Sequence, residues 1–138
     1  MRKHCAMGSR VFSPTDDERS KLCDHADLGG QILAGGQSPL IEMARSIAMT
    51  HHEKWDGSGY PHGLAGEDIP LVGRITAVAD VFDALSSSRP YKPAFSLEKS
   101  FEIMKAGDGT QFDPRVLQAF LDARETIVQT RLSFPDVA

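Results

Sequence analysis

Residues 51–61 read HHEKWDGSGYP, and this segment decides how the chain around it is interpreted. On its N-terminal side, Ser38 and Pro39 form a favourable helix start, and apolar residues then recur at three- and four-residue steps as far as His51. On its C-terminal side, residues 55–70 contain four glycines and two prolines, which predicts a structured loop. The segment therefore joins the end of an amphipathic helix to a loop shaped by its turns.

Helix patterns also flank this segment. Thr15 and Glu18 have capping-box spacing, which predicts a helix over residues 16–33 with a weak point at Gly29-Gly30 and a stop at Gly35-Gly36. Further helices are predicted over residues 71–88, 96–105 and 114–131, the last capped by Asp113. The helix over 71–88 carries one apolar face, formed by Ile75, Val78, Ala79, Phe82 and Leu85. No strand pattern competes, so the sequence predicts an all-α fold.

Length and charge limit the classes of protein. With 138 residues and 41% hydrophobic residues, residues 1–138 are expected to form one small domain. The net charge of -4 argues against a general DNA, RNA or membrane-surface binder, because such proteins need basic patches. Cys5 and Cys23 are too few for a disulfide framework, and no apolar stretch is long enough for a membrane span. A cytoplasmic protein without a membrane span is expected.

The histidines are candidate metal ligands. Neighbours on a helix point about 100° apart, so His51 and His52 are expected to diverge and to reach two ions lying side by side. His25 on the preceding helix and Asp80 on the following one can add a nitrogen and a carboxylate, a combination that suits Fe, Mn or Zn. The alternatives are a histidine that interacts with the helix dipole and a solvated aspartate.

The loop and the residues after the next helix are candidates for substrate binding. Trp55 and Tyr60 offer flat surfaces that can pack on a base or on a neighbouring loop. Arg89, Tyr91 and Lys92 place two cations and a ring where a metal-bound phosphate could be held. The alternative for this second group is an ordinary basic cluster at a helix end.

Three stretches together, HHEKWDGSGYPHGLAGEDIP, RITAVADVFDALSSSRPYK and GTQFDP, resemble the HD-GYP family, a branch of the HD metal-dependent phosphohydrolases. The resemblance covers roughly residues 22–121. It implies an all-α helical bundle of the HD-domain type, with two or three divalent metal ions, commonly iron or manganese. The implied activity is hydrolysis of cyclic di-GMP to linear pGpG or GMP, in bacterial signalling and often as the output domain of a response regulator.

The resemblance also implies roles for individual residues. It makes His51, His52 and Asp80 metal ligands, Arg89 and Lys92 contacts to the phosphates of the dinucleotide, and Tyr60 part of the substrate-binding loop. The family's preceding ligand histidine corresponds to His25 in HADLGGQIL, 26 positions before His51. His4 in MRKHCAMG is a rival for that role, and His25 is favoured because Ile32-Leu33 also fits the family's pattern.

One feature of the family is absent from the sequence. No His-Asp dipeptide occurs in the 138 residues, so the chain is expected to be the C-terminal part of such a domain, incomplete at its N-terminus, and no catalytic residue is assigned. A second hypothesis is an inactive remnant that binds GGDEF-domain proteins through the GYP loop, and a third is an HD phosphohydrolase for other phosphate esters. Besides cyclic di-GMP, the expected partners are GGDEF-domain proteins and a second copy of the chain.

Overall fold

The computed structural model describes residues 16–88 and 93–134, and all regular elements in these ranges are helices. In chain order they are α1 (Asp16–Ile32), α2 (Pro39–Thr50), the 3-10 helix η1 (Gly66–Asp68), α3 (Leu71–Ser86), α4 (Leu97–Ala106), α5 (Pro114–Asp122) and α6 (Arg124–Ser133). The prediction of an all-α fold is confirmed. None of the described helices combines the length and the apolar character that a membrane span requires.

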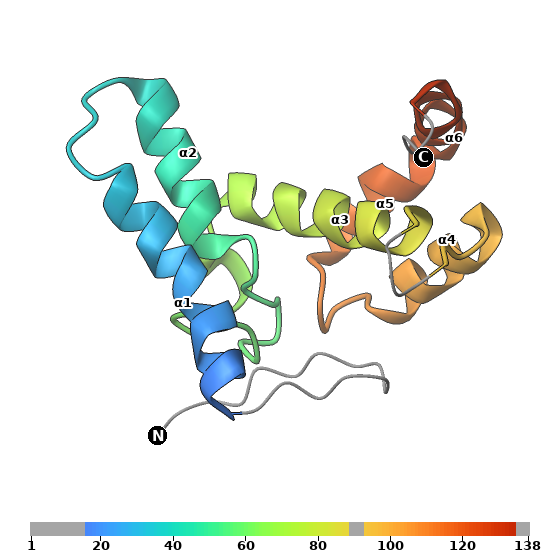
Figure 1. Cartoon of the computed structure of the whole chain (residues 1–138). Helices are drawn as coiled ribbons and strands as arrows, with labels where there is room; N and C mark the ends of the chain where they lie inside the picture. Colours follow the sequence, from blue (N-terminus) through green and yellow to red (C-terminus); the bar gives the residue numbers. More distant parts are fainter. Residues whose placement is uncertain (1–15, 89–92, 135–138) are drawn as a thin grey trace.

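The helices form two groups joined by α3. Figure 1 shows α1 and α2 side by side at one end of the molecule, and α4, α5 and α6 at the other. The helix α3 starts beside the end of α2, where buried Thr50 faces Gly73, and runs to the second group. The loop between α2 and α3 therefore lies against the first group.

The helix starts are where the sequence predicts them. The side chains of Ser38, Ser96 and Asp113 accept hydrogen bonds from the backbone N–H groups of Ile41, Lys99 and Arg115, respectively. The helix α1 is present from Asp16, the first described residue, and the proposed cap Thr15 lies outside the described residues. Short side-chain caps thus define three of the helices.

The predicted single helix over residues 114–131 is wrong, because the chain breaks at Ala123 into α5 and α6. Ala123 has φ -85° and ψ 13°, outside the helical geometry of its neighbours. The break allows Ile127 and Val128 of α6 to pack against the hydrophobic core. Neither glycine nor proline marks this position, so the local sequence gives no sign of it.

The main core lies between α3, α4 and α5. Its buried side chains are Val78, Phe82, Phe101, Met104, Phe112 and Leu117. The predicted apolar face of α3 is therefore correct in its C-terminal half and wrong for two residues, because Ala79 is exposed and Ile75 is 50% exposed. Ile75 lines an open depression of about 660 Å³ between α3 and α5, where none of the described helices covers it.

The predicted weak point at Gly29-Gly30 does not interrupt α1. A Cβ atom at Gly30 would lie 2.5 Å from Met49 Cγ, so the missing side chain lets α2 approach α1 closely. The Arg45 Nε–H group also donates a hydrogen bond of 3.2 Å to the carbonyl oxygen of Gly30. The glycines therefore serve helix packing, which brings the two histidine-bearing helices together.

Candidate metal centre

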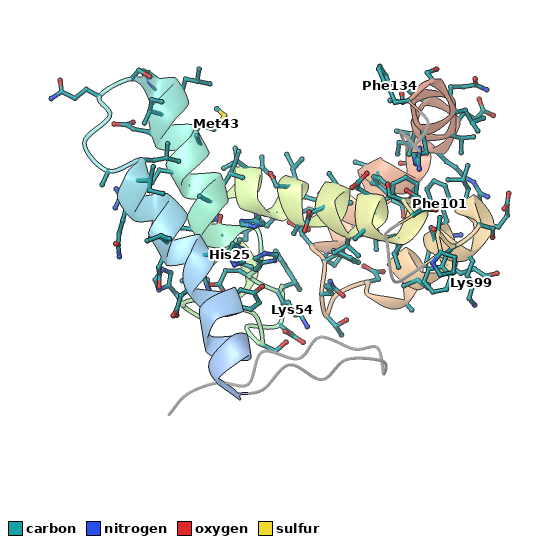
Figure 2. The ribbon with its side chains drawn as sticks, viewed as in Figure 1. His25, Met43, Lys54, Lys99, Phe101 and Phe134 are labelled. Carbon is teal, nitrogen blue, oxygen red and sulfur yellow. The ribbon has the colours of Figure 1, made fainter. Side chains whose placement is uncertain are left out.

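Three histidines meet where α1, the end of α2 and the following loop come together. His25 comes from α1, His51 caps the C-terminus of α2, and His52 is the next residue. One ring nitrogen from each lies within 4.8 Å of those of the other two, and the Nε2 atoms of His25 and His52 are 3.0 Å apart. Figure 2 shows His25 at this meeting point. The structure thus brings the candidate ligands at positions 25, 51 and 52 together.

The ring of His51 is oriented by the backbone of its own helix. Its Nδ1 atom lies 2.9 Å from the carbonyl oxygen of Ile47 and 3.0 Å from that of Ala48. Carbonyl oxygens only accept hydrogen bonds, so Nδ1 is the donor in these contacts, and in a neutral ring the lone pair is then on Nε2. This is the arrangement in which a histidine can bind a metal through Nε2.

The surroundings of His52 favour its neutral form. Burial, followed by the neighbouring His51 and His25, lowers the pKa of His52 to about 4, although the charge of Asp80 opposes this shift. At neutral pH the imidazole is therefore uncharged and has a lone pair to offer. A neutral imidazole is the form that binds metal ions.

The predicted divergence of the two adjacent rings is wrong. The ring centroids of His51 and His52 are 3.9 Å apart and the rings are tilted by 40°. The reason is that α2 ends at Thr50 with His51 as its C-cap, and His52 lies in the turn that follows, so the 100° step of a continuous helix does not apply between them. Their nitrogens converge with that of His25 on one small volume.

Asp80 lies on the exposed surface of α3, and its carboxylate is close enough to His52 to act on its charge. It does not belong to the group of donors that lie within 4.8 Å of one another in the described residues. The other predicted site residues Arg89, Tyr91 and Lys92, and the rival ligand His4, lie outside the described residues. Their roles stay predictions.

The glycine-rich loop covers the histidines with an aromatic ring. The ring of Tyr60 stacks on His52 with centroids 4.8 Å apart and an interplanar angle of 26°. The backbone N–H group of Tyr60 also donates a hydrogen bond of 3.2 Å to the carbonyl oxygen of His52. Tyr60 is therefore anchored to a candidate ligand through both its ring and its backbone.

Glu53 is a residue of this region that the sequence interpretation missed. Its side chain is buried, and the backbone N–H groups of residues 62–64 all donate hydrogen bonds to its carboxylate. A loop rich in glycine and proline leaves many backbone N–H groups without partners in a regular element. An acidic residue next to such a loop is the signal that could have identified Glu53.

A second support for the loop comes from the segment before α5. The N–H groups of Trp55 and Asp56 donate to the carbonyl oxygens of Gln111 and Thr110, respectively. Arg74 lies over the Trp55 ring, with its guanidinium carbon 5.9 Å from the ring centroid. The GTQFDP stretch is therefore part of the framework of the site, although it contributes no side chain to the histidine cluster.

Arg74 and Asp113 join the loop, α3 and α5. The Arg74 Nε–H group donates to the carbonyl oxygen of Ile69, and its Nη1–H group donates to Asp113 Oδ2 at 2.6 Å. Arg115 in the first turn of α5 also pairs with Glu67 of η1. Burial alone would raise the pKa of Asp113, but hydrogen bonds from Arg74 and from the N–H of Arg115 hold it below its usual value.

The residues present fit a first-row divalent metal ion. Three imidazole nitrogens are donors that Fe, Mn or Zn accept, whereas Mg and Ca prefer oxygen. Nitrogen ligands bound at about 2.1 Å and roughly at right angles lie about 3 Å apart. The Nε2 atoms of His25 and His52 lie 3.0 Å apart, which is close to this value and is also the length of a hydrogen bond between the two rings.

The family model of the HD domain matches residues 9–116 of the chain. The chain is 49% identical over 129 residues to a cyclic di-GMP phosphodiesterase of Vibrio cholerae, covering 90% of the chain and 26% of that protein. It is 47% identical over 115 residues to a cyclic di-GMP phosphodiesterase response regulator of Xanthomonas campestris, covering 83% of the chain and 30% of the relative. The chain thus spans less than a third of the length of these relatives.

Another relative and a protein of known structure are phosphodiesterases that are specific for a related cyclic dinucleotide. A 3'3'-cGAMP-specific phosphodiesterase of Vibrio cholerae is 46% identical over 112 residues, covering 81% of the chain and 22% of that protein. The crystal structure of a cyclic GMP-AMP specific phosphodiesterase from the same organism matches with a TM-score of 0.56 and 26% identity, covering 84% of the chain and 25% of that structure. The similar proteins therefore include enzymes for two cyclic dinucleotides.

Proposed function

The chain belongs to the HD-domain family, in its HD-GYP branch, and we propose that it forms part of a metal-dependent phosphodiesterase domain that hydrolyses cyclic di-GMP to pGpG or GMP. The observation that carries this proposal is the cluster of three imidazoles, with the ring of Tyr60 stacked on one of them, His52. A diester of a dinucleotide offers phosphate oxygens for metal ions and bases for aromatic stacking. The cluster and the ring suit both parts of such a substrate.

Each residue of the site has a proposed task. His25, His51 and His52 hold the metal, and Asp80 supplies a carboxylate toward a second ion. When bound, divalent ions of this kind activate water and polarise the phosphodiester. Tyr60 packs on a base of the substrate, and Arg89 and Lys92 offset the charge that develops on the phosphate oxygens. No residue of the chain is assigned as the general acid or base.

Further properties are proposed on the same basis. We expect two or three ions, iron or manganese in identity, in a domain to which residues 1–138 contribute the C-terminal part, with its family core at residues 22–121. We also expect a cytoplasmic protein that acts as the output of a response regulator, since one relative is a response regulator of this kind.

Hydrolysis of cyclic di-GMP tests the proposal. The chain, and any longer product of the same reading frame, is loaded with Mn²⁺ or Fe²⁺ and incubated with cyclic di-GMP, 3'3'-cGAMP or a simple phosphomonoester. We expect pGpG or GMP as the product and loss of turnover in Arg89→Ala and Lys92→Ala. A metal-loaded protein that leaves cyclic di-GMP intact contradicts the proposal, and preference for the phosphomonoester favours another HD phosphohydrolase.

A second function is favoured by the outer edge of the loop, where Asp56, Ser58 and His62 are exposed. We propose that this edge binds a GGDEF-domain protein, or a second copy of the chain, without needing a bound metal. Capture of a GGDEF protein by the metal-free chain, and its loss when Trp55 and Tyr60 are changed to alanine, would support binding. Capture that depends on bound metal would exclude this mode.

A further inference from the structure

The carboxylate of Glu53 accepts hydrogen bonds from three consecutive backbone N–H groups. Oε1 accepts from His62 at 2.7 Å and from Gly63 at 3.1 Å, and Oε2 accepts from Leu64 at 3.0 Å. The residue is 3% exposed, so these bonds replace the water that a carboxylate would otherwise need. Hydrogen bonds to a buried charge are stronger than neutral ones, and breaking one leaves a buried group unpaired.

The same residue also supports the loop through its backbone. A Cβ atom at Gly59 would lie 2.6 Å from Glu53 Cα and 2.3 Å from the backbone nitrogen of Lys54, so the loop passes directly over this backbone. Tyr60 follows Gly59 and precedes the three residues that bind the carboxylate. Contacts to Glu53 therefore hold the chain on both sides of Tyr60.

The hydrogen bonds to Glu53 hold the loop whose Tyr60 ring lies on the histidine cluster. The Tyr60 ring stacks on His52 at 4.8 Å, and the loop backbone on either side of it, at Gly59 and at residues 62–64, is held against Glu53. Glu53 itself does not belong to the histidine group, and both of its oxygens are already occupied by N–H donors. Its place in the structure is thus that of a support for Tyr60 and not that of a ligand or a proton carrier.

We infer that Glu53 is a positioning residue of the substrate site, because its carboxylate holds the loop of residues 59–64 and thereby sets the Tyr60 ring on His52. The part of this inference that concerns substrate binding rests on the proposed function. A loosened loop leaves the histidines in place, so the metal stays bound while the aromatic surface for the substrate loses its fixed position. The expected defect is therefore in binding and not in the chemical step.

Glu53→Gln tests the inference, because the amide keeps the length of the side chain and one acceptor oxygen. In this variant the amide oxygen can still accept hydrogen bonds from the N–H groups of residues 62 and 63. The amide NH₂ group cannot accept a hydrogen bond, so the N–H group of Leu64 faces another donor and loses its partner. In the metal-free chain we expect the nuclear Overhauser contact between the rings of Tyr60 and His52 to weaken. In the loaded enzyme we expect the KM for cyclic di-GMP to rise about tenfold, with little change in kcat and in bound metal.

Phe101→Leu is the matched control, since it weakens the buried core at the other end of α3 without touching the loop. It should lower stability and leave both the ring contact and the KM unchanged. Should Glu53→Gln not fold, Glu53→Asp takes its place, because it keeps the charge and shortens the reach by one methylene group. The same weakened ring contact and raised KM are expected.

The outcomes separate this inference from the proposed function. A wild-type chain that does not cleave cyclic di-GMP ends the proposed function, while the ring contact in the metal-free variants still decides whether Glu53 holds Tyr60. An active wild type with an unchanged ring contact or an unchanged KM in Glu53→Gln overturns the positioning role. Loss of bound metal in that variant also overturns it, because Glu53 would then act on the histidines.

Discussion

Different interactions hold the structure around the two ends of α3. At its C-terminal end, Phe82 packs on Phe101 with ring centroids 5.0 Å apart, and Met104 is fully buried beside them. At its N-terminal end, the histidine cluster and its loop are held by hydrogen bonds to Glu53 and by the Arg74–Asp113 pair. Figure 2 shows Phe101 and His25 at these opposite ends.

The difference separates stability from function. Buried apolar area supplies most of the free energy of folding, so the core around Phe101 is expected to carry the stability of the chain. Directional hydrogen bonds contribute less net free energy but fix geometry, which a binding site needs. Changes at the two ends should therefore be separable by experiment, in unfolding on one side and in metal or substrate binding on the other.

The largest effect is expected from Phe101→Ala in the core. Phe101 is 1% exposed, and removing a buried phenylalanine side chain costs about 4 kcal/mol of the free energy of unfolding. Urea unfolding followed by circular dichroism measures this loss. Ile32→Ala in α1 is the control, because Ile32 is 76% exposed and a change of less than about 0.5 kcal/mol is expected there. Equal losses of unfolding free energy in Phe101→Ala and Ile32→Ala would show that the core around Phe101 does not carry the stability of the chain.

Asp113→Asn is expected to have the next largest effect, because Asp113 connects the two ends. Its side chain is 1% exposed, and removing its charge leaves the guanidinium of Arg74 without its charged partner, at a cost of about 3 kcal/mol in unfolding free energy. The pKa of Asp113 is lower in the fold than in the unfolded chain, so the unfolded chain binds the proton more readily near pH 4. The stabilisation is therefore present above that pH and lost as the pH falls.

Urea unfolding at pH 7 and at pH 3 checks this dependence. The difference in stability between the wild type and Asp113→Asn should be large at pH 7 and smaller at pH 3. Glu102→Gln provides a control, because Glu102 pairs with Lys99 on the surface and its side chain is 68% exposed. A difference for Asp113→Asn that stays constant between the two pH values would show that the carboxylate charge contributes nothing.

The third effect concerns the histidine end. His52→Ala removes one of three nitrogens that lie within 4.8 Å of one another, and we expect the affinity for Mn²⁺ or Fe²⁺ to fall about 100-fold or more. Equilibrium dialysis with metal analysis measures this change. His62→Ala is matched in side chain and lies outside the cluster, so its metal affinity should equal that of the wild type. Unchanged affinity in His52→Ala would exclude the cluster as the metal site.

The helix boundaries could be predicted because their signals are local. Ser38, Ser96 and Asp113 mark helix starts through side chains that bond to the backbone three or fewer residues later. The break at Ala123 depends instead on packing of α6 against a core formed by distant residues. No nearby glycine or proline announces it, so only the folded chain reveals it.

The same distinction applies to the site. His25, His51 and His52 could be selected from residue type and from the family resemblance, because metal binding requires particular donor atoms. The convergence of adjacent rings depends on where α2 ends, and the role of Glu53 depends on the path of a loop that returns nine to eleven residues later. Such contacts carry no periodic pattern in the sequence.

The smallest effect is expected at the edge between α1 and the loop. His62 Nε2 lies 3.5 Å from Asp27 Oδ1, and both side chains are nearly half exposed, at 44% and 46%. A pair in such contact with water contributes about 0.5 kcal/mol or less, because solvent and salt screen it. Asp27→Asn should therefore change the urea midpoint only slightly, and the change should vanish in 1 M NaCl. A loss as large as that of Asp113→Asn would show that this surface pair holds the histidine end as strongly as the buried hydrogen bonds of Glu53 and Asp113 do. A loss that persists in 1 M NaCl would show that the pair acts through a contact that salt does not screen.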